Sequence, residues 1–294
     1  MSLIRAYIGR RLLSGWHKWR VAGQAAGDPD EVVLARLLNG KSMLVPRRDF
    51  VGKRLLWEGA YEYETVHLIE RLSDRLGRRD ILLDVGANLG SHTLFYADVF
   101  RRVHAFEPYP PTAALLRRNV EINDETGVHV YAIGLSSVDG ELDFVGELGA
   151  AGNLGSSAFL TSASSGAARA LRLPVRRGDC ILEEEGVGRV DVIKIDVEGH
   201  EIDVLAGLQR TIKRDRPVVV FEFQPHFLQA QGGFEAVKRL LGGYDLYVPS
   251  RASRMRGQFD QRALIVRHEV AIPLVQHLKR THDLAPTRQE RHAQ

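Results

Sequence analysis

From Ile81 onward, the chain alternates short apolar runs with longer segments that have the spacing of helices. Several of these runs are apolar at successive positions, which is typical of strands whose two faces are both covered by helices. Such alternation predicts an α/β fold with a mostly parallel sheet and helices on both faces. The expected strands are 81–85, 102–106, 128–133, 190–195 and 217–223, and the expected helices are 91–99, 111–122, 200–213 and 233–241.

The places where this rhythm stops indicate the domain boundaries. The apolar runs 244–248 and 262–267 follow one another without a helix, so they predict an antiparallel pair at one edge of the sheet. The predicted parts are a helical or mixed N-terminal extension (1–80), a sheet domain (81–268) with an insert at about 134–180, and a C-terminal tail (269–294).

Two segments outside the regular rhythm have their own patterns. Residues 61–76 have apolar positions at helical spacing, and Gly77 is expected to end that helix. Within the insert, 149–170 contains 7 Ala, 4 Gly and 5 Ser in 22 residues. A loop of this length is an active-site cover or a surface loop, and composition alone leaves both readings open.

Composition excludes several classes of protein. Hydrophobic residues make up 44% of the 294 residues and charged residues 26%, which excludes a disordered chain, a collagen and a coiled-coil rod. The formal net charge of +3 is too small to indicate a dedicated nucleic-acid binder. The single cysteine, Cys180, excludes an internal disulfide and an all-cysteine metal site, which fits a cytoplasmic protein.

The first 22 residues contain five basic side chains and no acidic one. Arg10 and Arg11 interrupt the apolar core that a signal peptide would need. Read as a helix, the segment carries an apolar stripe, so it packs on its own protein or rests on an anionic membrane surface. We expect no membrane-spanning helix, because no stretch of about 18 apolar residues exists.

The first chemical motif is Asp84-Val-Gly-Ala-Asn-Leu-Gly90, placed where an expected strand turns into an expected helix. Glycines at 86 and 90 allow the backbone to pass close to a ligand. The fingerprint of nicotinamide dinucleotide binding needs a third glycine, where this chain has Asn88. The motif therefore predicts a nucleotide-like ligand and disfavours a nicotinamide oxidoreductase.

Glu107 is the second candidate, at the end of the next expected strand and 17 residues after Gly90. A carboxylate at this place commonly accepts hydrogen bonds from ribose hydroxyls. Together with the glycine turn, it predicts a cofactor that carries a nucleoside.

The third motif is Lys194-Ile-Asp-Val-Glu-Gly-His-Glu201. Lys194 and Asp196 share one face of a strand, and a lysine in an apolar strand needs a partner, for which Asp196 is the nearest candidate in sequence. Glu198, Glu222 and His226 are expected to converge with Asp196 at the carboxyl ends of neighbouring strands. They predict a general base, a polar rim, or a site for Mg²⁺, Mn²⁺ or Zn²⁺, and the sequence fixes no metal geometry.

These motifs, with Phe106-Glu107-Pro108 and Asn119, resemble those of the FkbM-type S-adenosylmethionine-dependent methyltransferases. The resemblance runs from about residue 59 to residue 225, and its most specific part is the motif that begins at Lys194. It implies a class I, Rossmann-like sheet of seven strands. It also implies S-adenosylmethionine as the cofactor, with a divalent metal as an optional addition.

The resemblance also implies a role for individual residues. Asp196 is expected to face the methyl-transfer site, and Glu107 to hold the ribose hydroxyls. The expected cofactor contacts are Asp84, Gly86, Asn88 and Gly90 at the methionine end, Ala132 and Ile133 beside adenine, and Tyr61 and Glu62 closing over the cofactor.

The reaction that the resemblance implies is methyl transfer to a hydroxyl oxygen of a sugar, glycan or polyketide-like small molecule. An alcohol is a poor nucleophile at neutral pH, so we expect Asp196 to act as the base or to orient it. Glu198, Glu222 and His226 are the second choices for this role. The alternatives are a nucleic-acid methyltransferase, supported by clusters of arginines, and a non-catalytic module that binds the cofactor.

Overall fold

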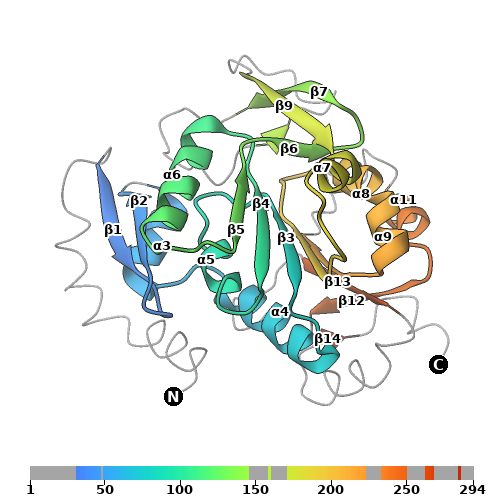
Figure 1. Ribbon diagram of the computed structural model, residues 1–294, viewed down its shortest axis with the longest axis horizontal. Coiled ribbons are helices and arrows are strands. Elements are labelled where there is room, and N and C mark those ends of the chain that lie inside the picture. Colours follow the sequence, from blue (N-terminus) through green and yellow to red (C-terminus); the bar gives the residue numbers. More distant parts are fainter. Residues whose placement is uncertain are drawn as a thin grey trace.

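The computed structural model has the expected α/β architecture, a sheet between two layers of helices (Figure 1). Among the described residues the sheet has eight strands rather than seven, in the order β14-β12-β13-β11-β10-β3-β4-β5, and the run from β11 to β5 is parallel. The expected antiparallel pair is confirmed as β12 and β13, and a two-residue β14 adds the eighth strand. The structure describes residues 31–47, 49–145, 158–159, 171–222, 233–249, 262–267 and 284–285. The strands of this sheet are β3 (Ile81–Val85), β4 (Arg102–Phe106), β5 (Val128–Tyr131), β10 (Val192–Ile195), β11 (Val218–Glu222), β12 (Tyr244–Pro249), β13 (Arg262–Arg267) and β14 (Leu284–Ala285).

Strand β3 is buried along its whole length because its alternate residues enter two different apolar cores. Leu82 packs into one core, whereas Ile81 and Leu83 pack into the other, as the two-residue period of a strand requires. Helices α3 to α6 cover the first core, and α7, α8, α9 and α11 cover the second (Figure 1). These helices are α3 (Phe50–Glu58), α4 (Tyr63–Leu76), α5 (Thr93–Tyr96), α6 (Pro110–Glu121), α7 (Gly178–Glu184), α8 (Glu201–Gly207), α9 (Gln209–Asp215) and α11 (Gly233–Leu240).

The helix predicted over 61–76 is confirmed, whereas the helix predicted over 200–213 is not a single helix. The helix expected over 61–76 is present as α4, and Gly77 ends it in the left-handed conformation with φ of 61°. The single helix expected over 200–213 is wrong, because the chain leaves helical geometry at Leu208 and forms α8 and α9 instead. The break directly follows Gly207, which packs so tightly on β6 that a Cβ there would lie 1.9 Å from the carbonyl oxygen of Ser136.

A second, smaller sheet forms from the segment that interrupts the alternation. Its order is β6-β9-β7-β8, and within it β7 and β9 pair antiparallel. The single strand expected over 128–133 is wrong in extent, because β5 ends at Tyr131 and the chain then enters the smaller sheet. The strands are β6 (Gly134–Ser136), β7 (Gly140–Val145), β8 (Ala158–Phe159) and β9 (Leu171–Arg177).

The described part of the predicted N-terminal extension contains strands and helices, and it begins with the hairpin of β1 (Val32–Arg36) and β2 (Ser42–Pro46). The amide of Asn119 on α6 clamps this hairpin to the sheet domain. Its Oδ1 accepts the Leu44 N–H at 2.7 Å, and its Nδ2 donates to the carbonyl oxygens of Leu44 and Leu89 at 3.1 and 2.9 Å. The domain boundary at residue 80 remains a prediction, since α3 and α4 pack into the same core as β3.

Three sequence-based expectations lie outside the described residues. They are the N-terminal segment 1–22, most of the Ala/Gly/Ser-rich segment 149–170, and the tail 269–294 apart from β14. Within the part of the chain that is described, no helix is long and apolar enough to cross a bilayer.

We predict that Asn119→Ala lowers the free energy of unfolding by about 2–4 kcal/mol, because three backbone groups lose a buried partner. Arg117→Ala, on the exposed side of the same helix, is the matched control and is expected to change stability by less than about 0.5 kcal/mol. Urea denaturation followed by circular dichroism measures both. Equal stability of the two variants would show that the clamp is not a major tie.

Candidate active site

The glycine turn after β3 lies between the ends of two neighbouring strands. The N–H groups of Gly86 and Ala87 both donate to the carbonyl oxygen of Phe106 on β4, each at 3.0 Å. On the other side, a Cβ at Gly86 would lie 1.9 Å from the carbonyl oxygen of Asp196, so no residue with a side chain fits there. Gly86 and Asn88 are both in the left-handed region, with φ of 75° and 50°. The turn therefore gives one wall of a pocket made of backbone.

Gly90 has a different role from the one expected. A Cβ at this position would lie 2.5 Å from Cδ1 of Leu116, so Gly90 is needed for packing of the turn against α6. Gly90 is not among the residues that line the pocket.

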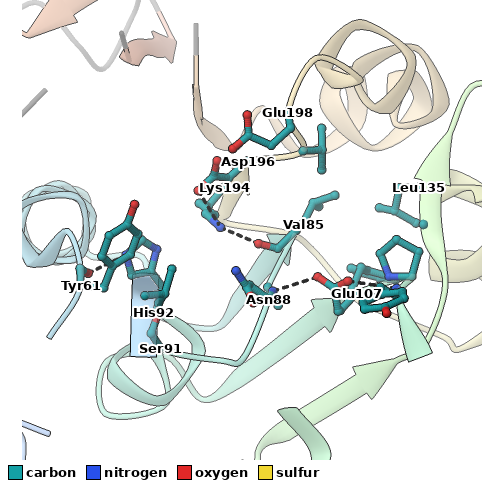
Figure 2. Close-up of a pocket in the computed structure, with 18 of the residues that line it drawn as sticks. Tyr61, Val85, Asn88, Ser91, His92, Glu107, Leu135, Lys194, Asp196 and Glu198 are labelled. Carbon is teal, nitrogen blue, oxygen red and sulfur yellow. Dashed lines mark hydrogen bonds and ion pairs between the residues drawn. The ribbon is translucent and has the colours of Figure 1, made fainter. Parts of the chain in front are cut away.

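Glu107 follows β4 and is buried in the pocket, with an exposed fraction of 8% (Figure 2). Its Oε2 accepts the N–H of Asn88 and its Oε1 the N–H of Tyr109, both at 3.0 Å. Burial raises the pKa of this carboxyl to about 7, although the two N–H donors and Lys194 oppose the rise. Each carboxylate oxygen keeps a lone pair for a further donor, so this group is oriented to accept hydrogen bonds from a ligand.

The ammonium group of Lys194 is buried at the centre of the site. The register of β10 and β3 places it opposite Asp84, and its Nζ lies 3.0 Å from Asp84 Oδ1. The same Nζ donates to the carbonyl oxygen of Gly86 at 3.0 Å and lies 3.5 Å from Asp196 Oδ2. The expected pairing of Lys194 with Asp196 is therefore secondary, because the cross-strand neighbour Asp84 is closer. Asp84 also accepts a hydrogen bond from Thr93 at 2.7 Å and lies beneath the pocket rather than in its lining.

Asp196 and Glu198 line the pocket at the carboxyl end of β10, as the sequence predicted (Figure 2). Glu198 and Gly199 both have left-handed backbone, with φ of 49° and 98°. Behind them, Glu201 accepts the Gly199 N–H at 3.0 Å. Burial raises the pKa of Glu201 to about 7, with smaller contributions from the charges of Asp196 and Glu198. This end of the pocket therefore brings together several acidic groups.

Tyr61 and Glu62, from the turn between α3 and α4, also line the pocket, and Tyr61 lies on the side away from Glu107 and Leu135 (Figure 2). The Tyr61 ring stacks on His92, with ring centroids 6.4 Å apart, and His92 Nε2 lies 3.0 Å from the Tyr61 carbonyl oxygen (Figure 2). A carbonyl oxygen only accepts, so this contact assigns the proton to Nε2 of His92. His92 is not predictable from the sequence pattern, because nothing in the glycine motif indicates that the segment after it contacts Tyr61.

The remaining predicted residues do not all lie at the pocket. Gly134 and Leu135 line it in place of Ala132 and Ile133, because the chain has turned into β6 by then. The side chain of Glu222 and the whole of His226 lie outside the described residues. In the described ranges, no group of three His, Cys, Asp or Glu side chains is arranged to hold a metal ion. Sequence reasoning also missed Ser91, Tyr109 and Phe144, which line the pocket.

A family model described as a methyltransferase FkbM domain matches residues 84–251, a range that includes the glycine turn, Glu107 and the Lys194 motif. The chain belongs to this family. Membership confirms the family resemblance seen in the sequence.

Curated relatives and solved structures are similar over part of their lengths. The hexuronic acid methyltransferase AglP of Haloferax volcanii is 31% identical over 153 residues, which cover 52% of this chain and 60% of AglP. The 2-O-methyltransferase NoeI of Sinorhizobium fredii is 25% identical over 181 residues, which cover 56% of this chain and 72% of NoeI. This chain thus spans less than two thirds of AglP. The crystal structure of methyltransferase FkbM from Methylobacillus flagellatus aligns with a TM-score of 0.44 and 17% identity, covering 64% of this chain and 43% of that one.

The raised pKa of Glu107 predicts a pH dependence of stability. A carboxyl that binds its proton more tightly in the folded state destabilises the fold as pH rises from about 4.5 to about 7. Glu107→Gln removes this titration, so the thermal midpoint of the wild type should fall relative to that of the variant across this window. A constant offset is also expected, because the amide NH₂ meets one of the two backbone N–H groups.

Thermal melts at half-unit pH intervals measure this difference, and Glu141→Gln, an exposed carboxyl on β7, is the control. Parallel pH profiles for the wild type and Glu107→Gln would contradict the raised pKa.

Proposed function

We propose that this chain transfers the methyl group of S-adenosylmethionine to a hydroxyl oxygen of a sugar, glycan or polyketide-like small molecule. The observation that carries the proposal is the Glu107 carboxylate, buried in the pocket and held by two backbone N–H groups beside the glycine turn. The printed names of AglP and NoeI, a hexuronic acid and a 2-O-methyltransferase, support oxygen as the methyl acceptor.

The residues of the pocket fit such a cofactor. Among the described residues, the side-chain oxygen of Asn88 lines the pocket, is buried and has no hydrogen-bond partner, so it is able to accept a hydrogen bond from a bound ligand. Gly86 lines the pocket with backbone alone, because the carbonyl oxygen of Asp196 occupies the place that its side chain would take. At the other end, Gly134 and Leu135 replace Ala132 and Ile133 as the proposed contacts of the adenine ring.

Each group of residues that lines the pocket has a proposed role in binding the cofactor or the acceptor. Bound S-adenosylmethionine supplies a methyl group on a positively charged sulfur. Glu107 accepts hydrogen bonds from the two ribose hydroxyls through its remaining lone pairs. Tyr61 and Glu62 close the methionine end together with His92. Holding the acceptor oxygen in line with the methyl group removes roughly 7–11 kcal/mol of the barrier in the best cases.

Asp196 is the proposed base for the acceptor hydroxyl. As the O–C bond forms and the bond from the methyl carbon to sulfur breaks, leaving its electron pair on sulfur, the hydroxyl proton passes to a carboxylate oxygen of Asp196, which lies in the pocket lining. The Lys194 ammonium, 3.5 Å from Asp196 Oδ2, favours the ionised form that a base needs. Glu198 lies in the same lining and is the second choice, and Glu222 and His226 remain candidates on sequence grounds.

We predict that Glu107→Ala weakens binding of S-adenosylmethionine at least tenfold, because the ribose hydroxyls lose a charged acceptor. Isothermal titration calorimetry of the folded wild type and variant with S-adenosylmethionine, and separately with NADH, measures this effect. The exposed Glu141→Ala on β7 is the control and should bind like the wild type. Equal affinity of Glu107→Ala and the wild type would remove Glu107 from the cofactor site, and selective binding of NADH would overturn the choice of cofactor.

We predict that Asp196→Asn keeps cofactor affinity within about threefold and lowers methyl transfer by about 10²–10⁴, the range for loss of a general base. The assay follows a labelled methyl group onto a panel of sugars, glycans, polyketide-like alcohols and RNA. Glu198→Gln is the matched variant from the same lining and is expected to retain most of the activity. Full turnover by Asp196→Asn would exclude it as the base, and transfer to RNA alone would favour the nucleic-acid alternative.

A further inference from the structure

The loop Asp196–His200 is held in a backbone conformation that it would not adopt unaided. Glu198 is one of the few described residues other than glycine with a positive φ, and Gly199 follows it in the same region. Residues with a Cβ avoid this region for steric reasons, and such positions persist only where surrounding contacts fix them. Because Glu198 lines the pocket, the contacts that fix this loop also place its carboxylate.

His200 makes the contact that leads away from the loop. Its ring is buried, its Nε2 lies 3.0 Å from Ser136 Oγ on β6, and its Nδ1 lies 3.6 Å from Asp203 Oδ2 on α8. Asp203 Oδ1 in turn accepts a hydrogen bond from Ser137 Oγ at 2.6 Å. Two side chains of the 200–203 segment are thus tied to two consecutive residues at the end of β6.

The neighbours of the His200 ring assign the position of its proton. The carboxylate of Asp203, 3.6 Å from Nδ1, makes an electrostatic contact that favours a proton on Nδ1, so Nε2 accepts the hydrogen bond from the Ser136 hydroxyl. Burial lowers the pKa of His200, which keeps the ring in this neutral form. Ser136, His200 and Asp203 contact one another in the same sequence as the serine, histidine and aspartate of a hydrolase catalytic triad. However, Ser136 is 1% exposed and faces a helix, so its oxygen is closed to any substrate.

The hydrogen bond between Ser136 and His200 connects the 196–200 loop to the pocket lining, because residues of β6 also line the pocket. Gly134 and Leu135, directly before Ser136, line the end that contains Glu107, whereas Asp196 and Glu198 line the other side. Helix α8 lies against β6 (Figure 1), and Gly207 permits the close approach of the two backbones. The Ser136–His200 contact is therefore a short, buried connection between two walls that meet different parts of a ligand.

We propose that His200 is a positioning residue that fixes the Asp196–Gly199 loop against β6, so that a ligand bound at Gly134 and Leu135 orders the loop that carries Glu198. The proposal rests on the proposed function only for the choice of ligand, S-adenosylhomocysteine. It assigns His200 no contact with the ligand and no step in the chemistry.

Hydrogen–deuterium exchange with mass spectrometry on the full chain, with and without S-adenosylhomocysteine, tests this coupling. In the wild type we expect the ligand to slow exchange of the backbone amides of 196–204 at least fivefold. Ser136→Ala and His200→Phe should bind the ligand within threefold of the wild-type Kd and lose that ligand-induced protection. His200→Gln, which keeps a hydrogen-bonding group near Ser136, should restore part of it.

The control is Thr211→Val on α9, which removes another buried hydroxyl bond, from Thr211 Oγ1 to Asp179 at 2.7 Å, without touching the loop. It should keep the protection seen in the wild type. The proposal is overturned if Ser136→Ala and His200→Phe retain full protection, if Thr211→Val loses it equally, or if both network variants lose ligand binding. Failure of the wild type to bind S-adenosylhomocysteine would instead contradict the proposed function, so the two failures are distinguishable.

Discussion

A lysine ammonium buried between the two central strands is the constraint on which the site depends. Removing such a group from water costs several kcal/mol unless acceptors replace its hydration. Lys194 meets this condition because the strand register sets it opposite Asp84, while Gly86 and Asp196 offer two more oxygens within 3.5 Å. The three acceptors come from the ends of both strands. The buried ammonium group therefore connects the carboxyl ends of β3 and β10 beside the pocket.

The two turns that follow these strands are shaped by one another. The turn after β3 passes under the carbonyl oxygen of Asp196 so closely that only glycine fits at position 86. The same turn donates two N–H groups to the end of β4, which places Asn88 beside the carboxylate of Glu107. Both turns contain left-handed backbone, at Asn88 and at Glu198, and they contribute the Gly86 backbone and the carboxylates of Asp196 and Glu198 to the pocket lining.

Much of this arrangement is predictable from the sequence, because local patterns determine it. Successive apolar residues predict the strands, and the position of Glu107 at the end of an expected strand predicts its place at the ligand-binding edge of the sheet. Contacts across the fold were not predictable in this way. The partner of Lys194 is Asp84, 110 positions earlier, and only the register of two non-consecutive strands reveals it. The same holds for the clamp that Asn119 places on the N-terminal hairpin.

The segment after Tyr131 breaks the alternation of strands and helices. It explains why Gly134 and Leu135 line the pocket, rather than Ala132 and Ile133, which the sequence predicted. A regular α/β repeat would carry the third strand through Ile133 and leave the pocket open beyond the Glu107 end. Instead the chain leaves the central sheet after Tyr131, so Gly134 and Leu135 face the pocket from β6. The smaller sheet then brings Phe144 against Tyr109, with ring centroids 5.8 Å apart, and both join a small apolar core with Leu173. Since Tyr109 also donates its N–H to Glu107, this insert is structurally part of the site and supports the wall around the carboxylate.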